Sequence, residues 1–322
     1  MSGSGTTGTR RSREDGFTQL AKPPGFPRPL PPVRFADRRY APARGEVVDV
    51  RLADGYTLFV EPVGEGDGLP LIVLHGGPGL DHTHLRPWLD PLGEERRIFY
   101  VDERGQGRSE RVDCETLSLE VFARDVDILA DALGLERFAL LGHSFGAIIT
   151  TFHAINVGTA EAYVISGGGD SSERLMADVE ASLAAMGEKG KAISESWEWE
   201  KTVETAEDCA ELMRIQNPFH FHGPPPPGFA EETVYVPDVL RHFANEGYGD
   251  FDYTPDLGRV AKPTLVLVGA EDRTTTPRAA QVLHDGIPGS ELAVLDGAGH
   301  MSMIEAQDAY LGAVNAFLAR AG

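Results

Sequence analysis

The chain has 322 residues, of which 41% are hydrophobic, and a formal net charge of −21. This length accommodates one large core with an insertion, and the negative charge argues against binding to nucleic acid or to an anionic membrane surface. The two cysteines provide no disulfide framework and no apolar run approaches the length of a membrane span, so we expect a cytoplasmic protein.

Residues 1–44 differ in composition from the rest of the chain. They contain nine Lys or Arg and three Asp or Glu, and they are rich in proline, glycine, serine and threonine. Arg10 and Arg11 suggest a twin-arginine export signal, but no apolar segment follows them. We therefore expect a flexible, basic, proline-rich extension, either disordered or packed on an acidic body.

The first strand signals follow this extension. Residues 47–51 and 57–60 flank Asp54-Gly55, which is typical of a hairpin turn. Residues 71–74 are all apolar, which suits a strand buried on both faces of a parallel sheet. They lead into His-Gly-Gly-Pro-Gly at residues 75–79, a loop whose backbone N–H groups could face a ligand. The alternative interpretation of this loop is an ordinary turn after a strand.

A further strand and an amphipathic helix come next. Residues 98–101 form an apolar run that ends in Asp-Glu-Arg-Gly-Gln-Gly-Arg-Ser at residues 102–109. From about Ser118, apolar residues recur on one face of a predicted helix, which Gly134 ends.

The most informative motif is Gly-His-Ser-Phe-Gly at residues 142–146, between a strand-like run and a helix-like run. A serine nucleophile needs such a sharp turn, and glycines on both sides let the two backbones approach closely. The pentapeptide alone is a weak signal, but the loop at residues 75–79 strengthens it. We predict Ser144 as the nucleophile and the N–H groups of Gly77 and Phe145 as oxyanion donors. His143 is a candidate substrate-binding residue.

A general base and its orienting acid are predicted near the end of the chain. Residues 264–269 form a buried strand followed by Glu271 and Asp272, and a last strand at residues 292–295 precedes His300. Both groups lie beyond the carboxyl ends of strands, where open α/β sheets place their sites. The order Ser, Asp, His matches this architecture, so His300 is the expected base and Asp272 its acid, with Glu271 as the alternative.

The strand–helix alternation is interrupted once. After a strand at residues 162–165, residues 170–255 are acidic, helix-forming and interrupted by proline. We expect a helical cap domain there, inserted into an α/β core formed by residues 45–169 and 256–322. The predicted core is a mostly parallel, eight-stranded sheet flanked by helices.

The chain resembles the α/β-hydrolases, and among them the prolyl aminopeptidase (proline iminopeptidase) family, over about residues 46–319. The matches are the segments 75–79, 102–109 and 142–146 and the pair Asp272 and His300. In the second segment Glu103 replaces the family's glutamine. This segment is expected to be a rigid scaffold loop in which Arg104 forms a structural ion pair.

The predicted cap carries the residues expected to decide the substrate. Trp199, Val203, Ala206, Ala210 and Met213 form one stripe on a helical wheel, which predicts cap core. The family has a Trp-Glu pair here, matched by Trp199-Glu200, and a later glutamate; these two acids recognise a free amino terminus. Gln216 stands in place of the second acid and suits a neutral group better than an amine. The alternative for Glu200 is an exposed helix acid.

Together these features predict a serine hydrolase that cleaves a small amide or ester through an acyl-enzyme. The resemblance favours release of an N-terminal residue from a short peptide. The alternatives are a carboxylesterase or carbon–carbon bond hydrolase acting on a neutral small molecule, or a non-hydrolytic cyclase or lyase. No cofactor is expected. The pairs His82/His84 and His220/His222 are better explained by loop polarity than by a metal site.

Overall fold

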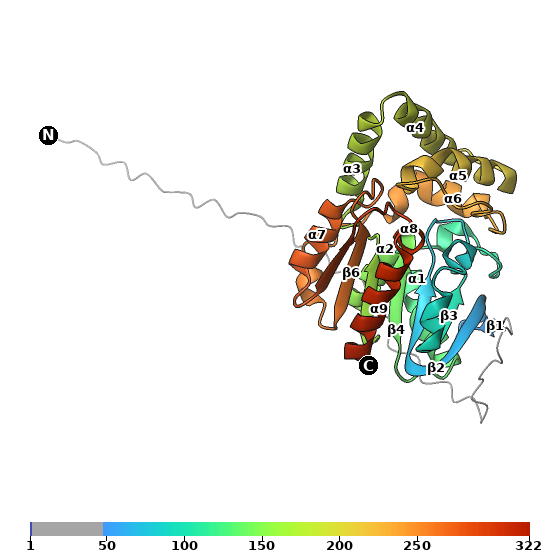
Figure 1. The fold of residues 1–322 in the computed structure, drawn as a ribbon, viewed down its shortest axis with the longest axis vertical. Coiled ribbons are helices and arrows are strands. Elements are labelled where there is room, and N and C mark those ends of the chain that lie inside the picture. Colours follow the sequence, from blue (N-terminus) through green and yellow to red (C-terminus); the bar gives the residue numbers. More distant parts are fainter. Residues whose placement is uncertain (2–47) are drawn as a thin grey trace. The chain divides into compact units, whose positions relative to one another are not determined.

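The computed structural model describes Met1 and residues 48–322; the predicted basic extension at residues 1–44 falls outside the described residues apart from Met1. Within residues 48–322, seven strands form one sheet in the order β1-β2-β4-β5-β6-β7, with β3 paired to β2 (Figure 1). The strands are β1 (Val48–Arg51), β2 (Thr57–Leu74), β3 (Arg96–Val101), β4 (Ala139–His143), β5 (Ala162–Ser166), β6 (Thr264–Gly269) and β7 (Glu291–Leu295). The predicted mostly parallel sheet flanked by helices is confirmed.

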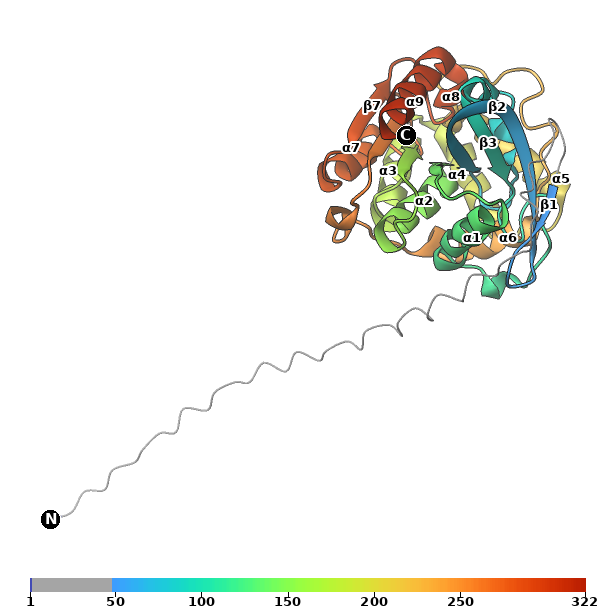
Figure 2. The same ribbon diagram turned by 90° about the horizontal axis from the view of Figure 1, so that it is seen from below.

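The strand count is seven instead of eight because two expected strands, at residues 57–60 and 71–74, belong to one continuous strand, β2. Residues 60–63 of β2 pair with residues 101–98 of β3, whereas residues 71–74 pair with residues 98–101 in the opposite sense. Both arms of β2 therefore contact β3, and Figure 2 shows β2 curving around it. The expected hairpin between β1 and the first arm is present.

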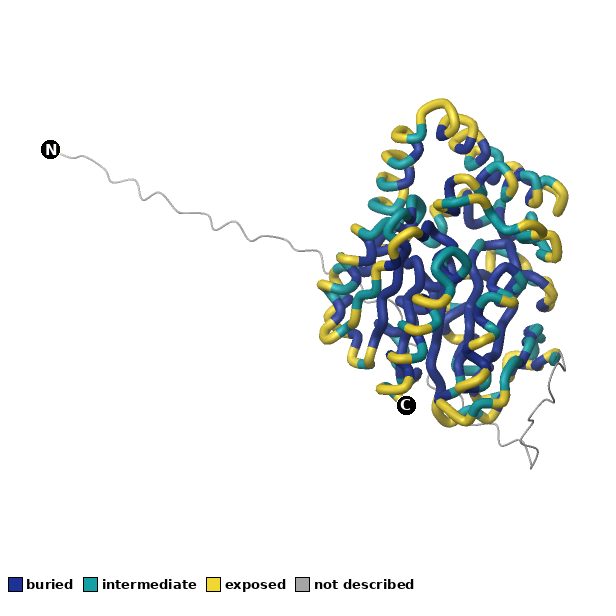
Figure 3. Tube along the Cα trace, viewed as in Figure 1, coloured by how far each residue is buried: buried dark blue, intermediate teal, exposed yellow. Residues whose placement is uncertain are grey.

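Helices cover the two faces of the sheet. Alternating strand residues such as Ile72 and Leu74 pack with α1 (Leu119–Ala132), α2 (Phe145–Asn156) and α7 (Pro277–Gly286). The intervening residues, such as Leu71 and Val73, pack with α9 (Gln307–Ala321), which follows the short α8 (Ser302–Glu305). The central strands are buried on both faces (Figure 3), as their all-apolar sequences predict.

A group of four helices lies between β5 and β6, at the carboxyl end of the sheet (Figure 1). We call residues 170–255 the helical insertion. Its helices are α3 (Ser172–Ala185), α4 (Glu188–Glu200), α5 (Ala206–His220) and α6 (Pro237–Asn245). None of the helices that the structure describes is both long and apolar enough to cross a membrane. The cytoplasmic location stays a prediction.

The apolar stripe expected from Trp199 to Met213 is wrong, because it spans two helices. The first helix, α4, ends at Glu200, and α5 begins after Thr205. Thr205 and Asp208 form a capping box, in which each side chain accepts the other residue's backbone N–H. This new start rotates the buried face of α5, which consists of Cys209, Leu212, Gln216 and Phe219, while Ala206 and Ala210 are exposed.

Candidate active site

Ser144 lies at the sharp turn between β4 and α2. Its φ of +55° and ψ of −115° are unusual for a residue with a side chain. The flanking glycines make this turn possible. A Cβ on Gly142 would lie 2.0 Å from the carbonyl oxygen of Gly146, and a Cβ on Gly146 would lie 2.6 Å from the carbonyl oxygens of Leu74 and His75. Both contacts are with backbone, which cannot rotate away.

We expect Gly146→Ala to lower the free energy of unfolding by about 3 kcal/mol, because the added methyl group must displace the end of β2. Gly312→Ala is the matched control: Gly312 lies exposed in α9, and a Cβ there would have no neighbour within 4 Å. That change should raise stability by about 0.5–1 kcal/mol. Urea denaturation measures both values, and equal effects would contradict this account of the turn.

His300 and Asp272 are brought together beyond the ends of β7 and β6. Nδ1 of His300 lies 2.8 Å from Oδ2 of Asp272, and both side chains are buried. Asp272 also accepts the backbone N–H groups of Thr274 and Thr275 at 2.8 and 2.9 Å and the Thr275 hydroxyl at 2.9 Å. These donors fix the carboxylate so that it accepts the Nδ1–H of the imidazole, which leaves Nε2 as the basic nitrogen.

Glu271, the alternative acid, has a different partner. Its Oε2 accepts the backbone N–H of Ala298 at 3.0 Å, so it supports the loop that leads to His300. The structure therefore places Asp272 against the imidazole. Ser144 and His300 line one cavity between the carboxyl end of the sheet and the helical insertion.

The loop at residues 75–79 presents one unpaired N–H group to this cavity. Three of its four N–H groups donate to neighbouring side chains: His75 to Glu103 at 2.9 Å, Gly76 to His84 at 3.3 Å and Gly79 to Gln106 at 2.6 Å. The N–H of Gly77 has no acceptor among the described residues, and Gly77 lines the cavity. Phe145, the first residue of α2, also lines it, and an N–H in the first turn of a helix has no intrahelical acceptor.

The cavity walls are largely apolar on the side of the helical insertion. Leu175, Met176, Val179, Trp197, Leu212 and Met213 contribute to them. The predicted contact from Trp199 is wrong, because Trp199 is not among the described residues that line this cavity and its side chain packs with the cluster that contains Val203. Trp197, two residues earlier in α4 and so on the other side of that helix, occupies the wall instead.

A polar cluster interrupts this apolar wall. The amide nitrogen of Gln216 donates to Oε1 of Glu200 at 2.6 Å, and the hydroxyl of Tyr248 donates to Oε2. Glu200 is only 4% exposed, which excludes the alternative that it is a solvent-exposed acid on the helix surface. Burial raises the pKa of Glu200 to about 7, against the effect of these two hydrogen bonds.

His143 contributes a second polar group to the cavity. It is buried, its Nδ1 lies 3.3 Å from the Ser166 hydroxyl, and its Nε2 has no partner among the described residues. Burial, together with the nearby His300 and His84, holds the pKa of His143 well below its usual value, so the ring is neutral. A neutral imidazole with a free nitrogen can exchange one hydrogen bond with a bound molecule.

Loop polarity does not account for two further histidines. His84 is buried and His220 is partly buried, and both line the cavity. The carbonyl oxygen of His220 accepts the N–H of His300 at 2.8 Å, which ties the end of α5 to the loop of His300. Tyr248, in the turn after α6, is a cavity residue that sequence reasoning does not find, because a single tyrosine in an irregular segment carries no motif.

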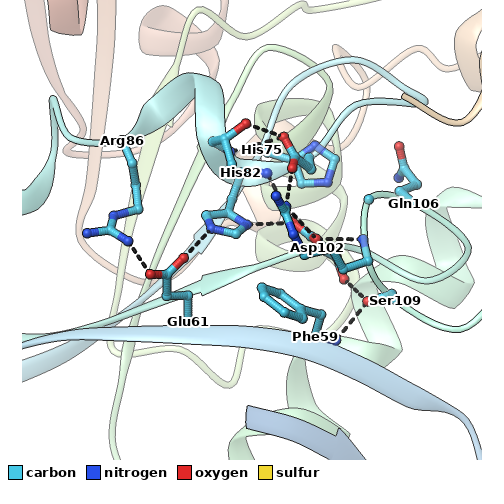
Figure 4. A network of polar contacts seen from close by, with 12 residues as sticks. Phe59, Glu61, His75, His82, Arg86, Asp102, Gln106 and Ser109 are labelled. Carbon is cyan, nitrogen blue, oxygen red and sulfur yellow. Dashed lines mark hydrogen bonds and ion pairs between the residues drawn. The ribbon is translucent and has the colours of Figure 1, made fainter. Parts of the chain in front are cut away.

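The segment 102–109 forms a scaffold, as predicted. Arg104 pairs with Asp125 and Asp54. Asp81, His82 and Asp102 are the only described residues whose ligand atoms cluster closely enough for a metal. However, Arg108 donates to Asp81. Figure 4 shows His82 between Asp102 and Glu61, and it donates to both carboxylates. These donors already compensate the negative charges of the carboxylates and hold the loops in place.

The sequence model of the alpha/beta hydrolase family matches residues 71–313. The chain belongs to this family. It is 26% identical to a proline iminopeptidase of Saccharolobus solfataricus over 267 residues, which cover 79% of this chain and 86% of the relative. It is also 26% identical to a proline iminopeptidase of Lactobacillus crispatus over 80% of this chain and 92% of the relative.

Two solved structures superpose on most of this chain. A proline iminopeptidase-related protein from Thermus thermophilus is 29% identical, with a TM-score of 0.66 over 86% of this chain and 98% of its own. An esterase from Exiguobacterium antarcticum is 19% identical, with a TM-score of 0.66 over 84% of this chain and 98% of its own. The esterase therefore shows the common fold alone.

Proposed function

We propose that this hydrolase cleaves a small amide or ester through an acyl-enzyme formed on Ser144. The Ser144 hydroxyl attacks the substrate carbonyl carbon while Nε2 of His300 takes its proton. Asp272 holds the imidazole in the required tautomer and stabilises its positive charge. The N–H groups of Gly77 and Phe145 stabilise the oxyanion. His300 then protonates the leaving group, and water releases the acyl group by the same steps.

The observation that carries this proposal is the fixed hydrogen bond between His300 and Asp272, 2.8 Å long, at the cavity that Ser144 and the free N–H of Gly77 also line. A strained serine, an oriented imidazole or an unpaired donor also occurs singly in proteins that catalyse no reaction. Their convergence on one cavity is what acyl transfer requires.

Within this chemistry we propose an aminopeptidase of the prolyl type. The curated relatives support it, and so does Glu200, a buried carboxyl group in the cavity wall that can receive an amino terminus. A carboxylesterase is the second candidate. Gln216 favours it, because the amide occupies one oxygen of Glu200 and adds no negative charge for an ammonium group.

A fluorophosphonate probe tests the shared chemistry, since it phosphonylates activated serines only. We expect wild-type protein to be labelled and Ser144→Ala to remain unlabelled. Ser166→Ala, which alters a buried serine at the end of the neighbouring strand, is the matched control and should still be labelled. A folded wild-type protein that resists the probe would exclude the serine hydrolase.

A further inference from the structure

A buried imidazole–carboxylate pair lies directly behind the loop that carries Gly77. His75 and Glu103 are 0% and 3% exposed. Nε2 of His75 contacts Oε2 of Glu103, and Oε1 of the same carboxylate accepts the backbone N–H of His75 at 2.9 Å. His75 lies beside the network around His82 and Asp102 (Figure 4). The proposed mechanism does not use this pair directly.

The contacts of both ring nitrogens of His75 are those that an imidazolium would make. Nδ1 lies 2.6 Å from the carbonyl oxygen of Gly76, which can only accept, so Nδ1 carries a hydrogen. Nε2 contacts Oε2 of Glu103, and the other oxygen of this carboxylate accepts the backbone N–H of His75, so the carboxylate is placed to accept a second ring hydrogen from Nε2. The Glu103 N–H also approaches Nε2, at 3.4 Å, but the carboxylate oxygen of the same residue lies closer to this nitrogen.

The surroundings maintain this charge at neutral pH. Burial alone would lower the pKa of His75, but attraction to Glu103, the hydrogen bond to it and the charge of Asp102 raise the pKa to about 9. His84 packs edge-on against His75 with ring centroids 6.1 Å apart. Burial and the charge of His75 lower the pKa of His84 to about 3, so His84 stays neutral.

The Gly76 carbonyl and the Gly77 N–H belong to the same peptide group. A charged hydrogen bond at the carbonyl oxygen draws electrons from the nitrogen through amide resonance, which makes the N–H a stronger donor. It also fixes the plane of a peptide that has no side chain on either residue and a φ of +133° at Gly77.

We propose that Glu103 keeps His75 protonated so that the imidazolium orients and polarises the Gly76–Gly77 peptide as an oxyanion donor. His75 and Glu103 are thus positioning residues for the hydrolysis, and this role rests on the proposed function. The prolyl aminopeptidase motif has glutamine at the position of Glu103. A glutamine can still accept the backbone N–H of His75, but it carries no negative charge to stabilise an imidazolium. The charged pair therefore distinguishes this chain from the motif.

The test compares Glu103→Gln with wild type in the hydrolysis of p-nitrophenyl butyrate. We expect kcat to fall about tenfold with KM almost unchanged, because a charge-assisted donor is replaced by a weaker neutral one that acts mainly in the transition state. In wild type, kcat should also fall as the pH rises through about 9, where His75 loses its proton. Glu103→Gln should lack this alkaline decrease.

Glu61→Gln is the matched control. It removes a carboxylate from His82 in the same network, away from Gly76 and Gly77, and should leave both kcat and its alkaline decrease in place. Nitrogen NMR of the wild-type histidines needs no variant. Both ring nitrogens of His75 should be protonated at neutral pH, and a neutral His75 overturns the inference even if Glu103→Gln fails to fold.

The remaining outcomes separate the two proposals. If the fluorophosphonate labels wild type but Glu103→Gln retains full kcat, this inference fails and the serine hydrolase stands. If both the probe and the ester leave folded wild-type protein unreacted, the proposed function fails and this inference fails with it. Equal losses of kcat in Glu103→Gln and Glu61→Gln would reduce the pair to a structural role.

Discussion

Asp272→Asn should lower kcat by about 10⁴-fold with little change in KM. The expected loss follows from the donors around the carboxylate. Oδ1 accepts two backbone N–H groups, from Thr274 and Thr275, so the amide oxygen of an asparagine must take that position. Its NH₂ group then faces Nδ1 of His300 in place of Oδ2 and donates to it. The imidazole is forced to carry its hydrogen on Nε2, where it cannot take the proton of Ser144.

Glu271→Gln is the control for this change, because it removes the adjacent carboxylate of the same loop. Its Oε2 accepts only the N–H of Ala298, a bond that an amide oxygen can replace, so kcat should change by about twofold at most. Steady-state kinetics, with thermal midpoints to show that both variants fold, measure the difference. A large loss in Glu271→Gln beside an active Asp272→Asn would reverse the assignment of the acid.

The residues at the carboxyl ends of the strands could be located from the sequence because a parallel sheet brings those ends to one edge. Buried strands are recognisable as short apolar runs, so Ser144, Asp272 and His300 could be placed at that edge without knowing any side-chain orientation. The same reasoning located the loop of Gly77. The continuity of β2 was not recognisable, since the glycine-rich residues 64–68 resemble a loop and are strand only because they contact residues 93–96.

The helical insertion was harder to predict because its residues face a cavity and not a regular core. The predicted apolar stripe from Trp199 to Met213 required a single helix. Thr205 and Asp208, however, form a capping box, which is the local signal for the start of a second helix. The contact of Tyr248 with Glu200 joins residues 48 positions apart and has no local signal. The same is true of the His75–Glu103 pair, whose partners lie on separate loops.

Gln216→Glu should increase kcat/KM for prolyl-arylamides by about ten- to a hundredfold while leaving neutral esters nearly unchanged. In wild type, Gln216 donates to Glu200, and a desolvated ammonium ion would meet at most one carboxylate there. A second carboxylate at this position adds a charged hydrogen bond, typically about 1.5–3 kcal/mol. The gain is specific to amines because a neutral ester has no charge to compensate.

The pH dependence gives this prediction a second readout. The raised pKa of Glu200, about 7, means that its negative charge is lost as the pH falls through 7 and is present above it. In wild type, kcat/KM for a prolyl-arylamide should therefore rise through neutral pH relative to that of p-nitrophenyl butyrate. Tyr248→Phe, which removes a donor from the same carboxylate without adding charge, is the control and should not improve amine substrates. If Gln216→Glu hydrolyses both substrate classes in the wild-type ratio, the amino group does not bind at Glu200, and the esterase becomes the better description of this cavity.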